Sequence, residues 1–263
     1  MGGVRESGFG NWEAESSQGG EGHASGDTSR IPNPESRPTT DPQDELFDVL
    51  DDEGRPTGVA KRRGDVHRDG DWHGALHIWV CGVGDDGRSF TLFQRRSMTK
   101  DTWPGYLDTT IGGHIRSGET LAETVREAEE EIGLAVSLDD LTWIGRRSVG
   151  GSRGQIIDRE VQSIYAVRSD QPLPDYRLHP QEVDALVAVE LDAVRRLFAA
   201  ETESVPAREC PRGGQPFEIT ITRDDFAIRD RTYVLAVLPG LAVVIAGRTP
   251  EPFDMRGQLP NPM

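Results

Sequence analysis

The chain of 263 residues has little cysteine and no long apolar run. Its two cysteines, Cys81 and Cys210, lie far apart and lack the spacing of a metal site, which excludes a disulfide framework and fits a reducing compartment. No stretch approaches the roughly 18 apolar residues of a transmembrane helix. The first residues also lack the basic and apolar regions of a secretory signal. We therefore expect a cytoplasmic protein that does not enter a membrane.

Positive charge is also scarce, because 29 Lys and Arg residues face 45 Asp and Glu residues, for a formal net charge of −16. Such a surplus of acid argues against general binding to nucleic acid and against binding to an anionic membrane surface. The length fits one or two domains. The sequence leaves a homodimer open.

Composition divides the chain into four parts. Residues 1–43 are rich in Gly, Ser, Glu, Pro, Asp and Thr, so they bury too little apolar surface to offset the entropy of ordering, and a disordered tail is predicted. We expect the main domain over residues 44–205. A small strand-helix extension is predicted over 206–250, followed by a flexible tail over 251–263.

The main domain alternates apolar strands with few helices, which predicts an α/β/α sandwich on a mixed sheet. A polar loop is expected over residues 62–73, between the first hairpin and a long apolar strand. In the extension, Pro239 and Gly240 should kink or break a hydrophobic helix over 230–246 that covers the sandwich. The predicted strands are 46–50, 57–61, 75–83, 89–94, 106–111, 141–149, 155–167, 183–189 and 217–222, and a helix is predicted over 192–198.

One stretch, residues 112–134, combines a glycine turn, an amphipathic helix and a helix stop. Thr120 and Glu123 have the spacing of a capping box, and Gly133 is typical of a helix end. One helix face is acidic, and its like charges repel unless a cation compensates them. Carboxylates grouped in this way suit Mg²⁺ or Mn²⁺, although an isolated E-x-x-E-E is more often a solvated surface. The acidic face consists of Glu127, Glu130 and Glu131.

These residues resemble the signature of the Nudix hydrolases, G-x5-E-x7-R-E-U-x-E-E-x-G-U, in which U is aliphatic. Only six residues separate Glu119 from Arg126 here, one fewer than in the signature, and on one continuous helix the missing residue would turn Glu119 by roughly 100°. The matching positions are Gly113, Glu119, Arg126, Glu127, Ala128, Glu130, Glu131, Gly133 and Leu134.

Residues 45–200 contain the motifs F-D-V-L-D-D-E-G-R-P-T-G-V-A, D-V-H-R-D-G-D-W-H, Q-R-R-S-M-T-K-D-T-W-P-G-Y-L-D and G-G-H. With these motifs the chain resembles the Nudix branch that includes isopentenyl-diphosphate isomerase. The resemblance implies metal ligands at His67, His73, His114, Asp158 and Glu160, and diphosphate-binding cations at Arg63, Arg96 and Lys100. Taken alone, a histidine in a polar loop needs no function, and the cations could belong to a solvated loop. A strand places Asp158 and Glu160 on one face.

Gly112 stands where those isomerases have an acid–base cysteine, and the complete R-E-x-x-E-E is a motif that they tend to lose in part. We therefore expect hydrolysis of a small-molecule diphosphate by metal-activated water, with Mg²⁺ or Mn²⁺ as the cofactor. A helix glutamate or Glu160 would be the general base, and the Gly112 carbonyl would assist the metal by resemblance. An isomerase without the usual cysteine and a non-catalytic, nucleotide-sensing domain remain alternatives.

Overall fold

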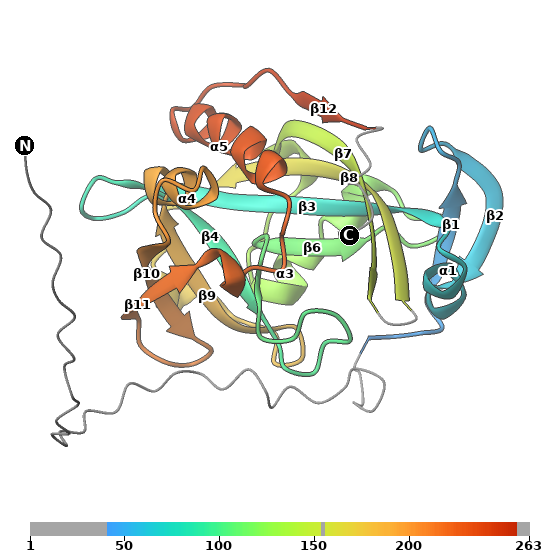
Figure 1. Cartoon of the computed structure of the whole chain (residues 1–263), viewed down its shortest axis with the longest axis horizontal. Helices are drawn as coiled ribbons and strands as arrows, with labels where there is room; N and C mark the ends of the chain where they lie inside the picture. The colour runs from blue at the N-terminus through green and yellow to red at the C-terminus, as the bar shows by residue number, and fades with distance from the viewer. Residues whose placement is uncertain (1–40, 154–155, 257–263) are drawn as a thin grey trace, which may run out of the picture. The chain divides into compact units, whose positions relative to one another are not determined.

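A mixed β-sheet is the framework of the computed structural model, which describes residues 41–153 and 156–256 (Figure 1). Along its main path the described strands lie in the order β11-β10-β9-β4-β3-β8-β7-β12, and β1, β2, β5 and β6 are attached to its side. The strands are β1 (Leu46–Leu50), β2 (Pro56–Arg62), β3 (Trp72–Val83), β4 (Ser89–Arg96), β5 (Leu107–Asp108), β6 (Ile111–His114), β7 (Thr142–Arg153), β8 (Ile156–Arg168), β9 (Val183–Glu190), β10 (Ser204–Pro211), β11 (Phe217–Thr222) and β12 (Phe253–Met255).

The centre of the sheet is the parallel pair of β3 and β8, in register from Trp72 opposite Arg159 to Cys81 opposite Arg168. Strand β3 also pairs with β1, β4 and β6, and most of its residues are buried. A strand covered on both faces needs a nearly continuous apolar run, and W-H-G-A-L-H-I-W-V-C-G-V provides one that is broken mainly by two histidines.

Helices cover both faces of this sheet, which confirms the predicted α/β/α architecture. Leu76, Ile78 and Val80 of β3 belong to a core cluster that includes residues of α3, whereas Trp79 and Cys81 belong to a second cluster with residues of α4 and α5. This alternation follows from the period of two in a strand. The α-helices are α1 (Arg63–Asp69), α2 (Leu121–Thr124), α3 (Glu127–Ile132), α4 (Leu191–Phe198) and α5 (Arg231–Ile245).

The prediction of a loop over residues 62–73 is wrong. Residues Arg63–Asp69 form α1, and β3 begins at Trp72. The helix is only seven residues long, and its polar sequence R-G-D-V-H-R-D has no apolar stripe to reveal it. Gly70 ends the helix in the left-handed conformation, at φ 69°. Consequently His67 lies on a helix and His73 on a strand, rather than together in a loop.

The predicted extension is built into the same sheet as the main domain. The expected boundary at residue 205 falls inside β10, which pairs with β9 on one side and with β11 on the other. Residues 253–255 of the expected flexible tail form β12 and pair with β7 in parallel. Residues 1–40 and 257–263, for which a tail was also expected, lie outside the described residues. The prediction of disorder is wrong for Asp41, which is 5% exposed because it pairs with Lys100.

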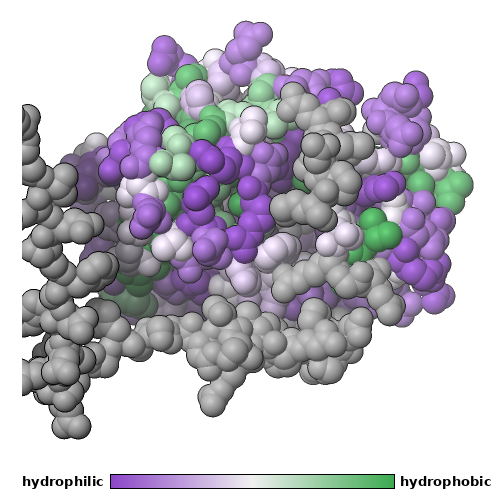
Figure 2. All heavy atoms as spheres, viewed as in Figure 1, coloured by the Kyte–Doolittle hydropathy of each residue, from purple (hydrophilic) through white to green (hydrophobic). Residues whose placement is uncertain are grey.

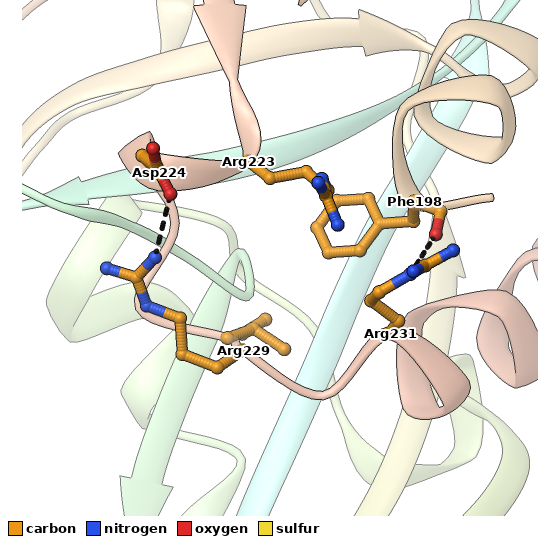
Figure 3. Close-up of a pocket in the computed structure, with 6 residues that line it drawn as sticks. Phe198, Arg223, Asp224, Arg229 and Arg231 are labelled. Atoms are coloured by element: carbon orange, nitrogen blue, oxygen red, sulfur yellow. Dashed lines mark hydrogen bonds and ion pairs between the residues drawn. The ribbon is translucent and has the colours of Figure 1, made fainter. Parts of the chain in front are cut away.

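Helix α5 continues through Pro239, so the predicted break does not occur. Proline removes one helical hydrogen bond, but the helix is held by its burial: Val234, Val237 and Leu241 are fully buried in the core. The contact with α4 is shown in Figure 3, where Arg231 donates from Nε to the Phe198 carbonyl at 2.6 Å. Phe198 is the last residue of α4, and cations are favourable at a helix C-terminus.

The surface agrees with the high content of charged residues. The face in Figure 2 is mainly hydrophilic, with smaller hydrophobic areas between the polar residues.

Cys81 and Cys210 are both buried, and no disulfide bond joins them. Over the described ranges, no helix has both the length and the apolar character required to cross a membrane.

Truncation of Leu241 tests whether α5 shares the core of the main domain. Leu241→Ala should lower the free energy of unfolding by about 2–5 kcal/mol, because a fully buried leucine leaves a cavity. Leu46→Ala, at a position that is 48% exposed, is the control and should cost far less. Urea denaturation followed by circular dichroism measures both. A separate early transition confined to α5, with the main transition unchanged, would show that the helix is an independent appendage.

Candidate functional site

An arginine clamp organises the acidic motif. Arg126 forms an ion pair with Glu119, contacts Glu127 with Nη2 to Oε1 at 2.8 Å, and lies 3.4 Å from Glu130 through Nε. The second oxygen of Glu119 accepts a hydrogen bond from the Arg116 backbone N–H at 3.1 Å. Glu119 therefore holds both the arginine and the glycine turn, although the spacer is one residue short.

A local tightening of the helix absorbs the missing residue. The capping box at Thr120 and Glu123 is present as predicted. The prediction of one continuous helix after this capping box is wrong, however, because α2 ends at Thr124 and α3 begins at Glu127. Between them, Arg126 donates its backbone N–H to Glu123 and Ala128 donates to Val125, three residues back rather than four. Three residues per turn is the geometry of a 3₁₀-helix, so this turn rotates α3 relative to α2.

Gly113 allows close packing of Glu127 against β6. A Cβ atom at Gly113 would lie 2.6 Å from Glu127 Cγ and 3.1 Å from its Cδ. By contrast, a Cβ at Gly112 would meet its nearest neighbour, Thr109 Cγ2, at 3.4 Å. A side chain at Gly113 therefore requires Glu127 to move, whereas one at Gly112 does not.

The three motif glutamates differ in their surroundings. Glu131 is 5% exposed and accepts a hydrogen bond from Gln94 Nε2 at 3.2 Å. Burial, together with the charge of Glu127, raises its pKa well above the usual value. Burial also raises the pKa of Glu127. Glu130 is exposed, with about half of its side chain accessible.

Four other side chains converge on one point from four different elements. His67 comes from α1, His73 from β3, His114 from β6 and Asp158 from β8. One potential ligand atom from each residue lies within 4.8 Å of all the others. Glu160, also on β8, lies 3.1 Å from His114 Nε2 through its Oε1.

The atoms that face one another in this histidine cluster make no well-directed hydrogen bond, although Glu160 Oε1 lies 3.1 Å from His114 Nε2 and Asp158 Oδ1 lies 3.5 Å from His73 Nε2. These buried atoms are Nε2 of His67, His73 and His114, and Oδ1 of Asp158. Buried polar atoms without a partner carry a large free-energy cost. Burial lowers the pKa of His67 to about 4 and that of His114 to about 3, so both rings are neutral at pH 7. Neutral imidazoles and a carboxylate form a donor set suited to a divalent transition metal.

The histidine cluster and the motif glutamates occupy opposite faces of β6. Adjacent residues of a strand point to opposite faces. His114 joins the histidines, whereas the neighbouring Gly113 packs against Glu127. Among the residues that the structure describes, the histidine cluster alone gathers three or more candidate ligands in this way. Thus the predicted ligands form two groups rather than one.

The predicted diphosphate-binding cations are already paired with acids. Arg63 lies 3.9 Å from Asp41 and 3.7 Å from Asp101, and Lys100 pairs with Asp41 and Glu182. Arg96 contacts Asp108 at 3.2 Å. Arg96 is nevertheless close enough to both groups to favour the ionised forms of Glu131 and Asp158, opposing the effect of their burial.

Several residues beside the histidine cluster were missed from the sequence. Phe47, which is fully buried, stacks on His73 and His114 with ring centroids 5.2 and 4.8 Å away. Gln162 donates a hydrogen bond to Glu160. The period of two along β8 could have identified Gln162, since it follows Asp158 and Glu160 on the same face. Nothing in the sequence indicates that Phe47 reaches the histidines.

A pocket of about 170 Å³ lies apart from these groups, because none of the predicted site residues lines it (Figure 3). It is bounded by the C-terminus of α4 and by the segment that leads into α5. Its lining consists of Phe198, Arg223, Asp224, Ile228, Arg229 and Arg231.

A matched pair of glycine variants tests the position of Glu127. Gly113→Ala should force Glu127 into another rotamer and lower turnover about 100-fold, since a displacement of about 1 Å can have that effect. Gly112→Ala should retain most turnover, because the added methyl group meets only ordinary contacts. Steady-state kinetics and a melting curve of each variant provide the comparison. Equal activity of the two variants would contradict the assigned position of Glu127.

Comparisons with known proteins show the family of the chain. The family model of the NUDIX domain matches residues 74–209. An uncharacterized Nudix hydrolase of Clostridium acetobutylicum is 33% identical over 204 residues, covering 76% of this chain and 98% of that protein. An isopentenyl-diphosphate Delta-isomerase of Corynebacterium diphtheriae is 34% identical over 158 residues, covering 56% of this chain and 79% of its own length. A solved structure, DR0079 from Deinococcus radiodurans, is 24% identical, covers 59% of this chain and 90% of its own, and has a TM-score of 0.42. The chain belongs to the Nudix family.

Proposed function

We propose that the protein is a divalent-metal-dependent hydrolase that cleaves the diphosphate linkage of a small molecule. The observation that carries this proposal is the arginine clamp. Arg126 still contacts Glu119, Glu127 and Glu130 despite the short spacer. A domain that only binds nucleotides has no need to retain this arrangement of carboxylates, so the clamp favours an enzyme over a sensor.

The motif glutamates have the chemistry to hold Mg²⁺ or Mn²⁺ beside a diphosphate. Such an ion neutralises phosphate charge and lowers the pKa of bound water. Glu127, Glu130 and Glu131 would supply carboxylate oxygens, and the family resemblance adds the Gly112 carbonyl as a further ligand. Glu131, buried beside Gln94, is our candidate for the general base, because a carboxyl with a raised pKa is better matched to neutral pH.

The histidine cluster would hold a second divalent ion. Its unpaired Nε2 atoms and the Asp158 oxygen fit that role, because an ion would satisfy all four at once. Arg63, Arg96 and Lys100 would stabilise the phosphate charge. Since each is paired with an acid, the substrate phosphates would have to compete with Asp41, Asp101, Asp108 and Glu182.

The same cluster favours a second candidate, isomerisation of isopentenyl diphosphate, since the related isomerase resembles this chain over more than half its length. Gly112 argues against it. A proton donor at that position would point towards His77, whose Nε2 lies 3.8 Å from the site of the missing Cβ. Glycine supplies no such group, and moving a proton on carbon requires one within about 3 Å.

Glu131→Gln should reduce metal-dependent turnover by about 100-fold or more and leave the fold intact. Glu129→Gln is the control, since Glu129 is the adjacent glutamate and is exposed. In the metal-free protein at pH 7, Glu131→Gln should be at least as stable as wild type. The raised pKa of Glu131 means that ionisation costs stability as pH rises above about 4.3, the unfolded value, and glutamine escapes this cost.

The stability difference between Glu131→Gln and wild type should therefore shrink as the pH falls to about 4. Urea denaturation at pH 4 and pH 7, paired with kinetic assays, checks both parts. Unchanged turnover in the Glu131→Gln variant would remove Glu131 from the proposed machinery.

A substrate panel separates hydrolysis from isomerisation. With Mg²⁺ or Mn²⁺, the protein should release phosphate or a monophosphate from at least one of a nucleoside triphosphate, ADP-ribose, a dinucleotide polyphosphate or a prenyl diphosphate. Isopentenyl diphosphate incubated in deuterated water should acquire no deuterium on carbon and yield no dimethylallyl isomer, as mass spectrometry would show. Deuterium on carbon would establish the isomerase instead, and binding without turnover would indicate a sensor.

A further inference from the structure

A buried chain of polar side chains connects helix α5 to the histidine cluster. Arg147 on β7 lies directly opposite Gln162 on β8, and its Nε donates to Gln162 Oε1 at 2.5 Å. Gln162 Nε2 in turn donates to Glu160 Oε2. The other oxygen of Glu160 is the one that lies beside His114. Arg147 and Gln162, through which this series of hydrogen bonds reaches Glu160, are 5% and 3% exposed.

The direction of these hydrogen bonds is fixed by Arg147. A guanidinium donates hydrogen bonds and accepts none. Gln162 must therefore turn its carbonyl oxygen towards Arg147 and its NH₂ group towards Glu160. Glu160 then receives a hydrogen bond on one oxygen, which leaves the second oxygen directed at the histidines. Without Arg147, the amide of Gln162 could rotate and present its oxygen to the carboxylate.

Helix α5 keeps Arg147 buried and in place. The Arg147 guanidinium carbon lies 3.4 Å from the centroid of the Tyr233 ring, a cation–π contact. Its Nη1 is 3.6 Å from Asp230, which caps the N-terminus of α5 by accepting from the Tyr233 backbone N–H. Tyr233 is itself fixed, since its hydroxyl accepts a hydrogen bond from Trp79 Nε1 at 3.0 Å.

We propose that Arg147 and Gln162 are positioning residues that orient the Glu160 carboxylate towards the histidine cluster, and that α5 serves the site by holding Arg147. This inference rests on the proposed histidine metal site, to which Glu160, whose Oε1 lies 3.1 Å from His114 Nε2, would add a carboxylate ligand. An oriented carboxylate raises metal affinity because the ligand does not have to be reordered on binding. Loss of an outer residue of this kind typically lowers metal affinity by 10–100-fold.

Mn²⁺ binding to the full-length, metal-stripped chain tests the proposal by calorimetry. The relevant binding event is the one that His73→Ala abolishes. Arg147→Met should weaken that event by about 10–100-fold, and Arg147→Lys, which keeps a donor-only cation, should weaken it less. Arg146→Met is the matched control, because Arg146 is the preceding residue on β7, is partly exposed and pairs with Asp254. Its Mn²⁺ affinity should equal that of wild type.

Gln162→Met gives a second route to the same conclusion and covers the case in which Arg147→Met does not fold. It should weaken Mn²⁺ binding as Arg147→Met does, and the double variant should bind no more weakly than either single variant, because both act through one chain of contacts. Wild-type affinity in a folded Arg147→Met or Gln162→Met protein would overturn only the proposal that Arg147 and Gln162 position Glu160. Failure of the wild-type chain to show any Mn²⁺ binding that depends on His73 would remove the proposed histidine metal site as well.

Discussion

The parallel pairing of β3 with β8 is the constraint on which the rest of the structure depends. It places His73 opposite Glu160 and Ala75 opposite Gln162. Because β3 also pairs with β6, His114 lies opposite Ala75 in the next strand. A one-residue slip between any two of these strands would turn its polar side chains to the other face of the sheet. The continuous apolar residues of β3, which must remain buried, are what fix the register.

The sheet also explains how one short segment serves two groups of ligands. Strand β6 has only four residues, and two adjacent ones, Gly113 and His114, face opposite sides of the sheet. Glycine is required on the helix side because Glu127 fills the space that a side chain would occupy. Histidine is suited to the other side, where β1 contributes the apolar ring of Phe47. The G-G-H sequence therefore meets two separate packing requirements.

Much of the fold followed from local patterns, since hydrophobic alternation placed most strands and the capping residues located the start of the motif helix. The resemblance to known families supplied the histidines and Asp158, which no spacing in the sequence would have brought together. The interruption between α2 and α3 was not predicted, because the apolar stripe of Leu121, Val125, Ala128 and Ile132 continues across it. Arg147 escaped notice for another reason: its surroundings come from Tyr233, 86 positions later in the chain, and no local pattern reports such a contact.

Strand β12 has a consequence for the behaviour of the protein at high concentration. It pairs with β7 at Gly145, Arg146 and Arg147, on the side of β7 that would otherwise be the outer border of the sheet. An uncovered border of a long strand is a template for joining another chain and a common origin of aggregation. The covering strand is short and carries Asp254, which pairs with Arg146 and Arg256. A charged side chain on a three-residue border strand disfavours further strand addition at this side of the sheet.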